Sequence, residues 1–137
     1  MSNSFRVHNS ESTKGKPTRW YSNRQEKAVA AAVNGKQSAN SGATLFDKSD
    51  VKTDLFTIEC KTKITNSESF TLKRAWFDKQ MRESIQMGKP YSAIVINFGP
   101  DAPYNENYYI INENLFRTLL DYLNEDTPRS WLNENIY

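Results

Sequence analysis

The segment over residues 55–61, LFTIECK, is the feature that most limits how this chain can fold. Successive side chains of a β-strand point to opposite faces, so Phe56, Ile58 and Cys60 would share one face, and Glu59 and Lys61 the other. One face is then apolar, whereas the other carries a carboxylate and an amine whose Cα atoms lie roughly 6.6 Å apart. We therefore expect a strand that covers a core with one side and builds a small polar site with the other.

A helix is expected before this strand. Ser22 or Asn23 can cap it, the sequence RQEKAVAAAVN continues it, and Gly35 suits the left-handed turn after its end. Its expected buried face consists of Val29, Ala32 and Val33.

Further strands and helices follow from the same patterns. Strands are expected at 36–39, at 51 and at 55–61, with a tight turn at 52–54, and then at 91–98 and 108–111. Helices are expected over about 72–87 and over 115–123, the last beginning at 112–114. The expected buried stripe of the middle helix is Trp76, Phe77, Met81, Ser84 and Ile85.

The connection from residues 55–61 through a helix to residues 91–98 is long enough for a right-handed crossover, which makes the two strands parallel. The fold class is therefore α/β, with a mixed central sheet flanked by helices in the order α-β-β-β-α-β-β-α.

With 137 residues, the chain is expected to build one core. Residues 1–19 are a flexible basic leader that carries too few apolar side chains to offset its ordering entropy, residues 20–124 are the single domain, and residues 125–137 are a C-terminal tail. The basic end of the leader has two interpretations, a solvated tail or an arm that contacts phosphates.

Composition excludes several classes of protein. A net charge of +2 is too small to indicate nucleic-acid binding without a clustered patch. No run approaches the ~18 apolar residues of a membrane span, and the start of the chain lacks a signal peptide, so we expect a soluble, intracellular protein without membrane partners. One cysteine and one histidine cannot build a disulfide or a cysteine-rich zinc site, so any metal site would use oxygen ligands and favour Mg²⁺ or Mn²⁺.

Asp50 and Glu59 are the expected ligands of such an ion, with the backbone carbonyl of Cys60 as a third oxygen. Nine extended residues would separate the two carboxylates by about 30 Å, so the turn at 52–54 is needed to bring them together. Lys61 would orient or help deprotonate the attacking water, or stabilise the pentacovalent phosphorus. Without metal, the mutual repulsion of the carboxylates should raise their pKa values above the usual ~4. The alternative for this motif alone is a surface salt bridge on a half-exposed strand.

Four other side chains have competing interpretations. Cys60 is expected to be a small core residue rather than a redox group. Trp76 is expected in the core rather than as a base-stacking platform, and Trp20 with Tyr21, beside Arg19 and Arg24, is a candidate nucleic-acid contact.

The order of these pieces resembles the phage-type Holliday-junction resolvases of the PD-(D/E)xK nuclease superfamily. The resemblance covers most of the chain between Arg24 and about Leu120 and rests on the segments Arg24-Gln25-Glu26, Asn40-Ser41-Gly42-Ala43, Lys48-Ser49-Asp50-Val51, Ile58-Glu59-Cys60-Lys61-Thr62, Ser69-Phe70 and Lys79. This chain departs from the family at Ser49, where a glycine is frequent, and no proline precedes Asp50.

The resemblance implies a restriction-endonuclease-like core with a metal-dependent phosphodiester hydrolase site at the edge of the sheet. It makes Glu26 the carboxylate of the first helix, Asp50 and Glu59 metal ligands, and Lys61 the catalytic lysine. Ser41 and Lys79 match the family pattern less closely. Arg19, Arg24, Ser41, Lys73 and Lys79 are the candidate DNA contacts.

The resulting hypothesis is a divalent-metal-dependent endonuclease that cuts branched DNA, with Holliday junctions as substrate and no organic cofactor. Paired symmetric cuts favour a two-fold homodimer. A phage or prophage origin, and with it a place in the bacterial cytoplasm, follows from the resemblance. The alternatives are a repair or restriction-like nuclease acting on duplex or flap DNA, and a nucleic-acid-binding module of the same fold that does not cleave.

Overall fold

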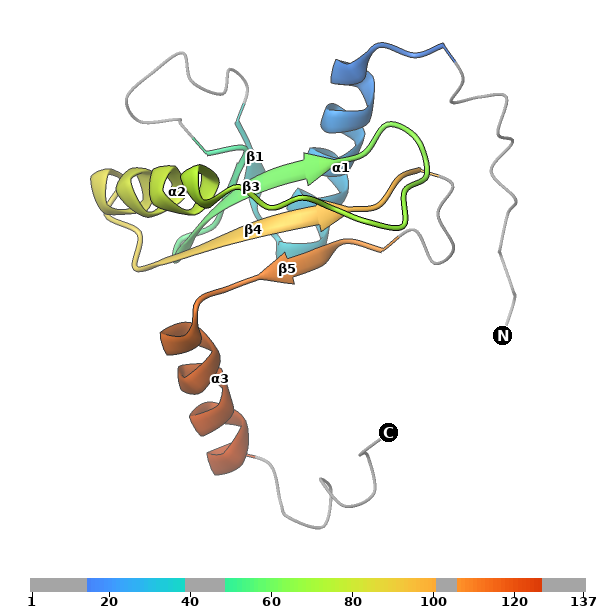
Figure 1. The fold of residues 1–137 in the computed structure, drawn as a ribbon. Helices are drawn as coiled ribbons and strands as arrows, with labels where there is room; N and C mark the ends of the chain where they lie inside the picture. The colour runs from blue at the N-terminus through green and yellow to red at the C-terminus, as the bar shows by residue number, and fades with distance from the viewer. Residues whose placement is uncertain (1–14, 39–48, 101–105, 127–137) are drawn as a thin grey trace.

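The computed structural model describes residues 15–38, 49–100 and 106–126, and these residues form a mixed five-stranded sheet with three helices (Figure 1). The elements follow in the order α1 (Thr18–Val33), β1 (Lys36–Gln37), β2 (Val51–Lys52), β3 (Phe56–Thr62), α2 (Arg74–Gln86), β4 (Tyr91–Asn97), β5 (Tyr108–Ile110) and α3 (Glu113–Asp126). The α/β class and this order of elements are as predicted.

The strands lie in the order β1-β2-β3-β4-β5. β3 and β4 are parallel, whereas the other three neighbouring pairs are antiparallel. The parallel pair confirms the expected crossover through α2, because a helix is the usual connection between parallel neighbours. β3 therefore lies at the centre of the sheet, and its two faces are covered by different helices.

α1 begins at Thr18, earlier than the predicted cap at Ser22 or Asn23, and Pro17 precedes it. Proline suits the start of a helix because its missing N–H would have no helical partner there. Asn34, with φ of 54°, provides the left-handed end instead of Gly35. Gly35 is needed for another reason, since a Cβ there would lie 2.8 Å from the backbone oxygen of Lys52.

The predicted buried face of α1 is only partly correct. Tyr21, Gln25 and Val29 are buried, whereas Ala32 is exposed. These three residues are spaced by four and therefore share one side of the helix. The prediction missed this side because glutamine is usually exposed.

The predicted stripe of α2 is wrong in part as well. Met81 and Ile85 are 56% and 72% exposed, and Gln80, Glu83 and Ser84 are the buried residues of this helix. Helix α2 therefore turns a polar side toward the sheet, where the side chains of Thr57 and Glu59 are also buried. A search for apolar periodicity cannot find such a face.

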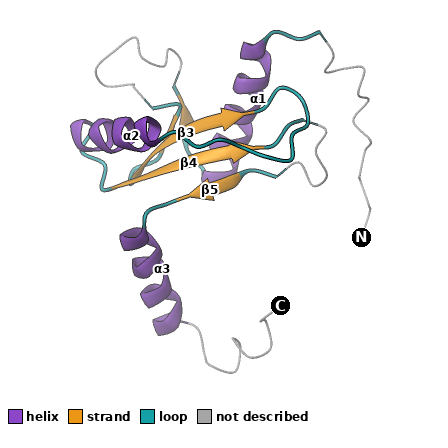
Figure 2. Ribbon diagram, in the orientation of Figure 1, coloured by secondary structure: helices purple, strands orange, loops and turns teal. Residues whose placement is uncertain are grey.

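The hydrophobic core lies on the α1 side of the sheet, around the fully buried Val29. It consists of Val29, Val51, Ile58, Ala93 and Val95, with partly buried neighbours at its edges. Coloured by secondary structure, Figure 2 shows the sheet with α1 and α2 against it, while α3 leads away from the other elements. No helix among residues 15–38, 49–100 and 106–126 combines the length and apolarity needed to cross a bilayer.

Candidate active site

The register of β2 on β3 brings Asp50 next to Glu59. Val51 pairs with Ile58 and Lys52 with Thr57, so extending the antiparallel register by one residue puts Asp50 opposite Glu59. The turn that makes this possible is closed by the backbone N–H of Thr53, which donates to the carbonyl of Phe56 at 3.0 Å. The two carboxylates that the sequence predicted to converge therefore come from facing positions of one hairpin.

Ser49 fixes the point at which β2 leaves β3. Its side chain is fully buried, and its Oγ accepts a hydrogen bond from the backbone N–H of Ile58 at 2.8 Å. The same hydroxyl lies 2.9 Å from the carbonyl of Ile58 and 2.8 Å from that of Val51, to either of which it can donate. Ser38 in turn donates to the carbonyl of Ser49. The backbone just before Asp50 is thus held by side-chain hydrogen bonds where the ladder ends.

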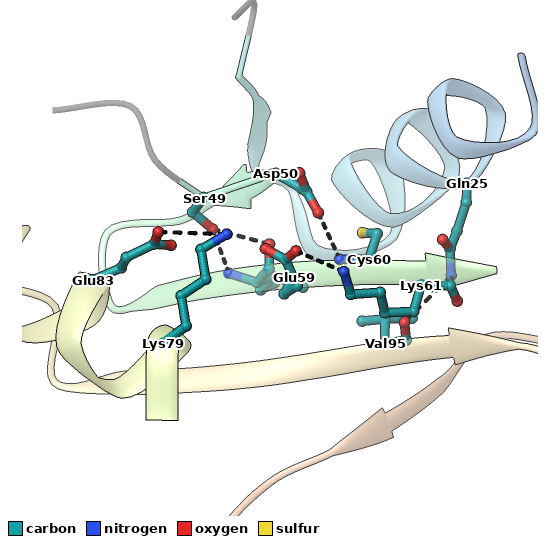
Figure 3. A network of polar contacts seen from close by, with 10 residues as sticks. Gln25, Ser49, Asp50, Glu59, Cys60, Lys61, Lys79, Glu83 and Val95 are labelled. Atoms are coloured by element: carbon teal, nitrogen blue, oxygen red, sulfur yellow. Dashed lines mark hydrogen bonds and ion pairs between the residues drawn. The ribbon is translucent and has the colours of Figure 1, made fainter. Parts of the chain in front are cut away.

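The carboxylate of Asp50 provides the hydrogen-bond acceptor that a neighbouring strand would otherwise provide for the next residues of β3. Its Oδ2 accepts a hydrogen bond from the backbone N–H of Cys60 at 2.9 Å (Figure 3). In an antiparallel ladder the N–H and C=O of one residue point toward the same neighbouring strand. The Cys60 carbonyl therefore points to the edge where Asp50 lies, as its expected role as a third oxygen requires.

Glu26 adds a third carboxylate from α1. Its Oε2 accepts a hydrogen bond from the side-chain amide of Gln37 in β1 at 2.9 Å. Partial burial and the negative charge of Asp50 raise the pKa of Glu26 from 4.5 to about 7, despite the opposing hydrogen bond from Gln37 and the charge of Arg19. A carboxyl with this pKa exchanges its proton near neutrality, as acid–base catalysis requires.

Glu59 is buried beneath α2 and retains only 9% of its exposure. Its Oε1 lies 3.3 Å from the Nζ of Lys61, two residues along the same strand (Figure 3). Burial, and then the charge of Asp50, raise the pKa of Glu59, whereas Lys61 and Lys79 oppose that rise. The raised pKa of Glu59 agrees in direction with the prediction for this residue, but burial rather than repulsion by Asp50 is its largest cause.

Cys60 lies between these groups, as expected for a packed residue rather than a reactive one. Burial raises the pKa of its thiol far above the usual range, and the charges of Asp50, Glu26 and Glu59 add to that rise. Since the thiolate is the reactive form, the thiol is inert at neutral pH.

Lys61 is positioned by three contacts. Its ammonium pairs with Glu59 and lies 4.8 Å from the centre of the Trp76 ring. Its backbone carbonyl accepts a hydrogen bond from the side-chain amide of Gln25, a buried residue of α1. Trp76 is half-buried, so it is neither fully packed in the core nor free to stack on a base. Its ring restricts the positions that the ammonium of Lys61 can reach.

Trp76 belongs to a wider group that we call the cation–aromatic cluster. Its members are Lys61, Lys63, Phe70, Lys73 and Trp76. Lys63 lies 5.3 Å from the ring centre of Phe70, and Lys73 lies 5.9 Å from that of Trp76. A second such group lies at the start of α1, where Lys16, just before the helix, and Arg24 contact the ring of Trp20 at 5.9 and 5.5 Å.

Lys79 extends from α2 toward the same side of β3 (Figure 3). It lies 3.8 Å from Oε1 of Glu83, a buried carboxylate one turn further along the helix. The other oxygen of Glu83 has no hydrogen-bond partner among the residues that the structure describes. Lys79 therefore links the polar side of α2 with the site, because its positive charge also opposes the rise in the pKa of Glu59.

Most of the predicted site residues come together. Glu26, Asp50, Glu59 and Lys61 gather where β1, β2 and β3 meet α1 and α2, and Lys79 lies beside them. Ser41 lies outside the described residues. Sequence reasoning gave no role to Gln25 or Gln37 and treated Ser49 as a departure from the family pattern. The four-residue spacing of Gln25 from Tyr21 and Val29 was a signal for its burial.

The chemistry of these donors fits a hard divalent cation. Glu26 and Glu59 have raised pKa values without a cation. The carbonyl of Cys60 points to the same edge of the sheet. The available donor atoms are therefore carboxylate and carbonyl oxygens, which hard divalent cations prefer. Within the described segments no three acidic, histidine or cysteine side chains already form a complete ligand set.

Comparison of the chain with protein-family models, with curated proteins and with solved structures gives no match.

Proposed function

We propose that this protein is a divalent-metal-dependent endodeoxyribonuclease with a restriction-endonuclease-like core, which hydrolyses phosphodiester bonds in branched DNA such as Holliday junctions. The observation that carries the proposal is the position of Asp50 opposite Glu59, with the Nζ of Lys61 3.3 Å from Oε1 of Glu59. Glu26 lies close enough to Asp50 for the charge of Asp50 to raise its pKa. The choice of branched DNA rests on the resemblance of the sequence to phage-type resolvases.

Asp50, Glu59 and the Cys60 carbonyl would hold Mg²⁺ or Mn²⁺. The bound ion supplies positive charge that activates water and offsets the charge on a phosphodiester. The other roles belong to residues of the chain itself. Ser49 and the Cys60 N–H fix Asp50, and Lys61 presents an ammonium to a phosphate oxygen while Trp76 and Glu59 limit its motion.

Glu26 is suited to moving a proton. With a pKa of about 7, it can accept a proton from water or return one to a leaving oxygen without a large energetic cost. The cation–aromatic cluster supplies positive charge beside the carboxylates, which offsets the repulsion between DNA phosphates and an acidic site.

The test uses a labelled four-way junction with Mg²⁺ or Mn²⁺ and compares the parent with Glu59→Gln. We expect the variant to lose cleavage and to bind the junction at least as tightly, because it loses a negative charge that faces phosphates. Asp78→Asn, which alters an exposed carboxylate of α2, is the matched control and should cut like the parent. Equal cutting by Glu59→Gln would remove Glu59 from the mechanism. Competition with linear duplex of the same sequence separates junction cleavage from a repair or restriction-like activity.

A second candidate is a nucleic-acid-binding module of the same fold that does not cleave. It requires only the positive charge that the cation–aromatic cluster presents, without a bound ion. Junction binding by the parent without cleavage in either metal would support this second function. The buried carboxylates argue against it, because a protein that only binds has no use for acidic groups facing phosphate.

A further inference from the structure

A small polar pocket lies at the carboxyl ends of the parallel strands β3 and β4. Its volume is about 90 Å³, and its polar lining residues are Arg24, Gln25, Thr62, Asn97 and Asn107. Thr62 and Asn97 are the last residues of the two strands and pair with each other, and both strands point the same way in Figure 1. Open α/β sheets bind ligands in the crevice at such strand ends. The carboxylates of the candidate active site do not line this pocket, so it is a separate site.

The side chain of Gln25 brings an unpartnered polar atom to this pocket. Gln25 is only 6% exposed, and its Nε2 donates to the carbonyl of Lys61 at 2.9 Å and lies 3.4 Å from that of Val95 (Figure 3). Its Oε1 accepts no hydrogen bond from any residue that the structure describes. A buried acceptor without a donor is unfavourable. We therefore expect a ligand of this pocket to supply an N–H or O–H group to Gln25.

The other polar groups of the pocket include hydrogen-bond donors. Arg24 carries a guanidinium, which can only donate. Asn107 accepts through its Oδ1, which lies 3.4 Å from Nε2 of Gln25 and 3.2 Å from Nδ2 of Asn97, so its own Nδ2 is the group that can donate to a ligand. A matching ligand has one donor next to acceptors. The pairing edge of cytosine has this pattern, because its 4-amino group donates and its N3 and O2 accept.

The size and the walls of the pocket also suit one pyrimidine ring. A single water needs about 10–15 Å³ of such space, so this pocket has room for roughly six waters. That space is close to the size of one pyrimidine and too small for the fused rings of a purine. The buried ring of Tyr21 is part of the lining, and aromatic rings stack on nucleobases.

Positive groups lie on both sides of the pocket. Lys61 and Lys63 of the cation–aromatic cluster precede and follow Thr62 in the chain. On the other side, Lys16 and Arg24 contact the ring of Trp20 at the start of α1. Cations of this kind hold a DNA backbone. A strand bound between them passes the pocket, with one phosphate near Lys61.

We propose that this pocket binds an unpaired cytosine of the DNA substrate next to the phosphate that is cut. The 4-amino group donates to Oε1 of Gln25, and Arg24 and Asn107 donate to the N3 and O2 of the base. The inference rests on the proposed function and adds a substrate requirement to it, namely an unpaired base at the branch. Since the amide of Gln25 also holds the carbonyl of Lys61, binding of the base fixes the end of the strand that carries this lysine.

The test measures binding of the full chain, in EDTA, to labelled four-way junctions that differ in one unpaired nucleotide at the branch. This nucleotide carries cytosine, thymine, pyrimidin-2-one, which is cytosine without its amino group, or no base. Fluorescence anisotropy should show at least tenfold tighter binding of the cytosine junction than of the abasic junction. The preference for cytosine over thymine and over pyrimidin-2-one should be at least fivefold, because each loses the donor that faces Gln25.

A variant that fills the pocket tests the location of the site. Ala28 is an exposed residue of α1 that lines the pocket, and leucine is a good helix former, so Ala28→Leu should occupy the space and leave the fold intact. This variant should bind all four junctions with equal affinity. Ala31→Leu changes an exposed residue of α1 that does not line the pocket, and this matched control should keep the preference of the parent.

Equal binding of the cytosine and abasic junctions by the parent would overturn the inference. A preference for cytosine that survives in Ala28→Leu would also overturn it, because another surface would then recognise the base. Cleavage assays with Mg²⁺ or Mn²⁺ separate this inference from the nuclease proposal. A parent that cuts junctions without a base preference retains the nuclease function and loses the pocket, whereas a preference without cleavage does the reverse. A parent that binds none of the junctions would overturn both.

Discussion

Glu26 should make the stability of the metal-free protein fall as the pH rises. Its pKa is about 7 in the folded protein and ordinarily 4.5, so the folded state binds the proton more tightly than the unfolded state. Its stabilising contribution is therefore complete below about pH 4.5 and is lost as the pH rises through 7. One pKa unit is worth about 1.4 kcal/mol, so the shift corresponds to at most about 3 kcal/mol. Because this carboxyl is partly exposed, solvent screening reduces the expected effect to about 1–2 kcal/mol.

The measurement is urea unfolding in EDTA at pH 5, 6, 7 and 8 for the parent and for Glu26→Gln. The amide cannot ionise, so the variant should lose about 1–2 kcal/mol less than the parent between pH 5 and 8. Glu125→Gln, which changes an exposed carboxylate of α3, should follow the parent curve. Added Mg²⁺ at pH 8 should stabilise the parent more than Glu26→Gln, because binding to the folded state shifts the equilibrium by mass action. Identical pH slopes for parent and Glu26→Gln would refute the assignment of repulsion to this site.

Three further results are expected. Ser49→Ala should lower the free energy of unfolding by about 1–3 kcal/mol, because the N–H of Ile58 loses its buried acceptor, and chemical denaturation measures it. Trp76→Leu should slow cleavage with little change in KM, and Trp76→Phe should recover part of the rate, since the aromatic face that orients Lys61 is worth about 0.5–1 kcal/mol at a partly exposed site. Cys60 should resist a thiol-specific reagent at pH 8 in the folded protein and react quickly in denaturant, because burial raises the pKa of its thiol; rapid reaction without denaturant would contradict its packed position.

The sheet was predictable because its strands carry clear local signals. The alternation at residues 55–61 and the apolar run at residues 91–98 indicated β3 and β4, and the length of the connection between them indicated their parallel pairing. The two-residue length of β2 was enough for the turn at 52–54 to place Asp50 opposite Glu59. These features depend on neighbours in sequence or on chain length.

The polar supports of the site were not predictable in the same way. Gln25 contacts the carbonyls of Lys61 and Val95, which are 36 and 70 residues away, and only its four-residue spacing from Tyr21 and Val29 marks it as buried. The inward face of α2 was missed for a related reason, because its buried residues, Gln80, Glu83 and Ser84, are all polar. In α1, the long-range hydrogen bonds of Gln25 accompany the side of the helix that turns inward, and apolar periodicity alone does not show that side.

The short pairing of β2 has a consequence for how the protein would respond to heat. Only Val51 and Lys52 belong to that strand, so the segment carrying Asp50 is held by few ladder bonds, by the hydroxyls of Ser38 and Ser49, and by the bond from the Cys60 N–H to Asp50. Such a segment can detach while β3 and β4 stay paired over seven residues. Cutting activity would then fade at temperatures where circular dichroism still reports an intact fold, and bound cation or DNA would narrow the gap between the two.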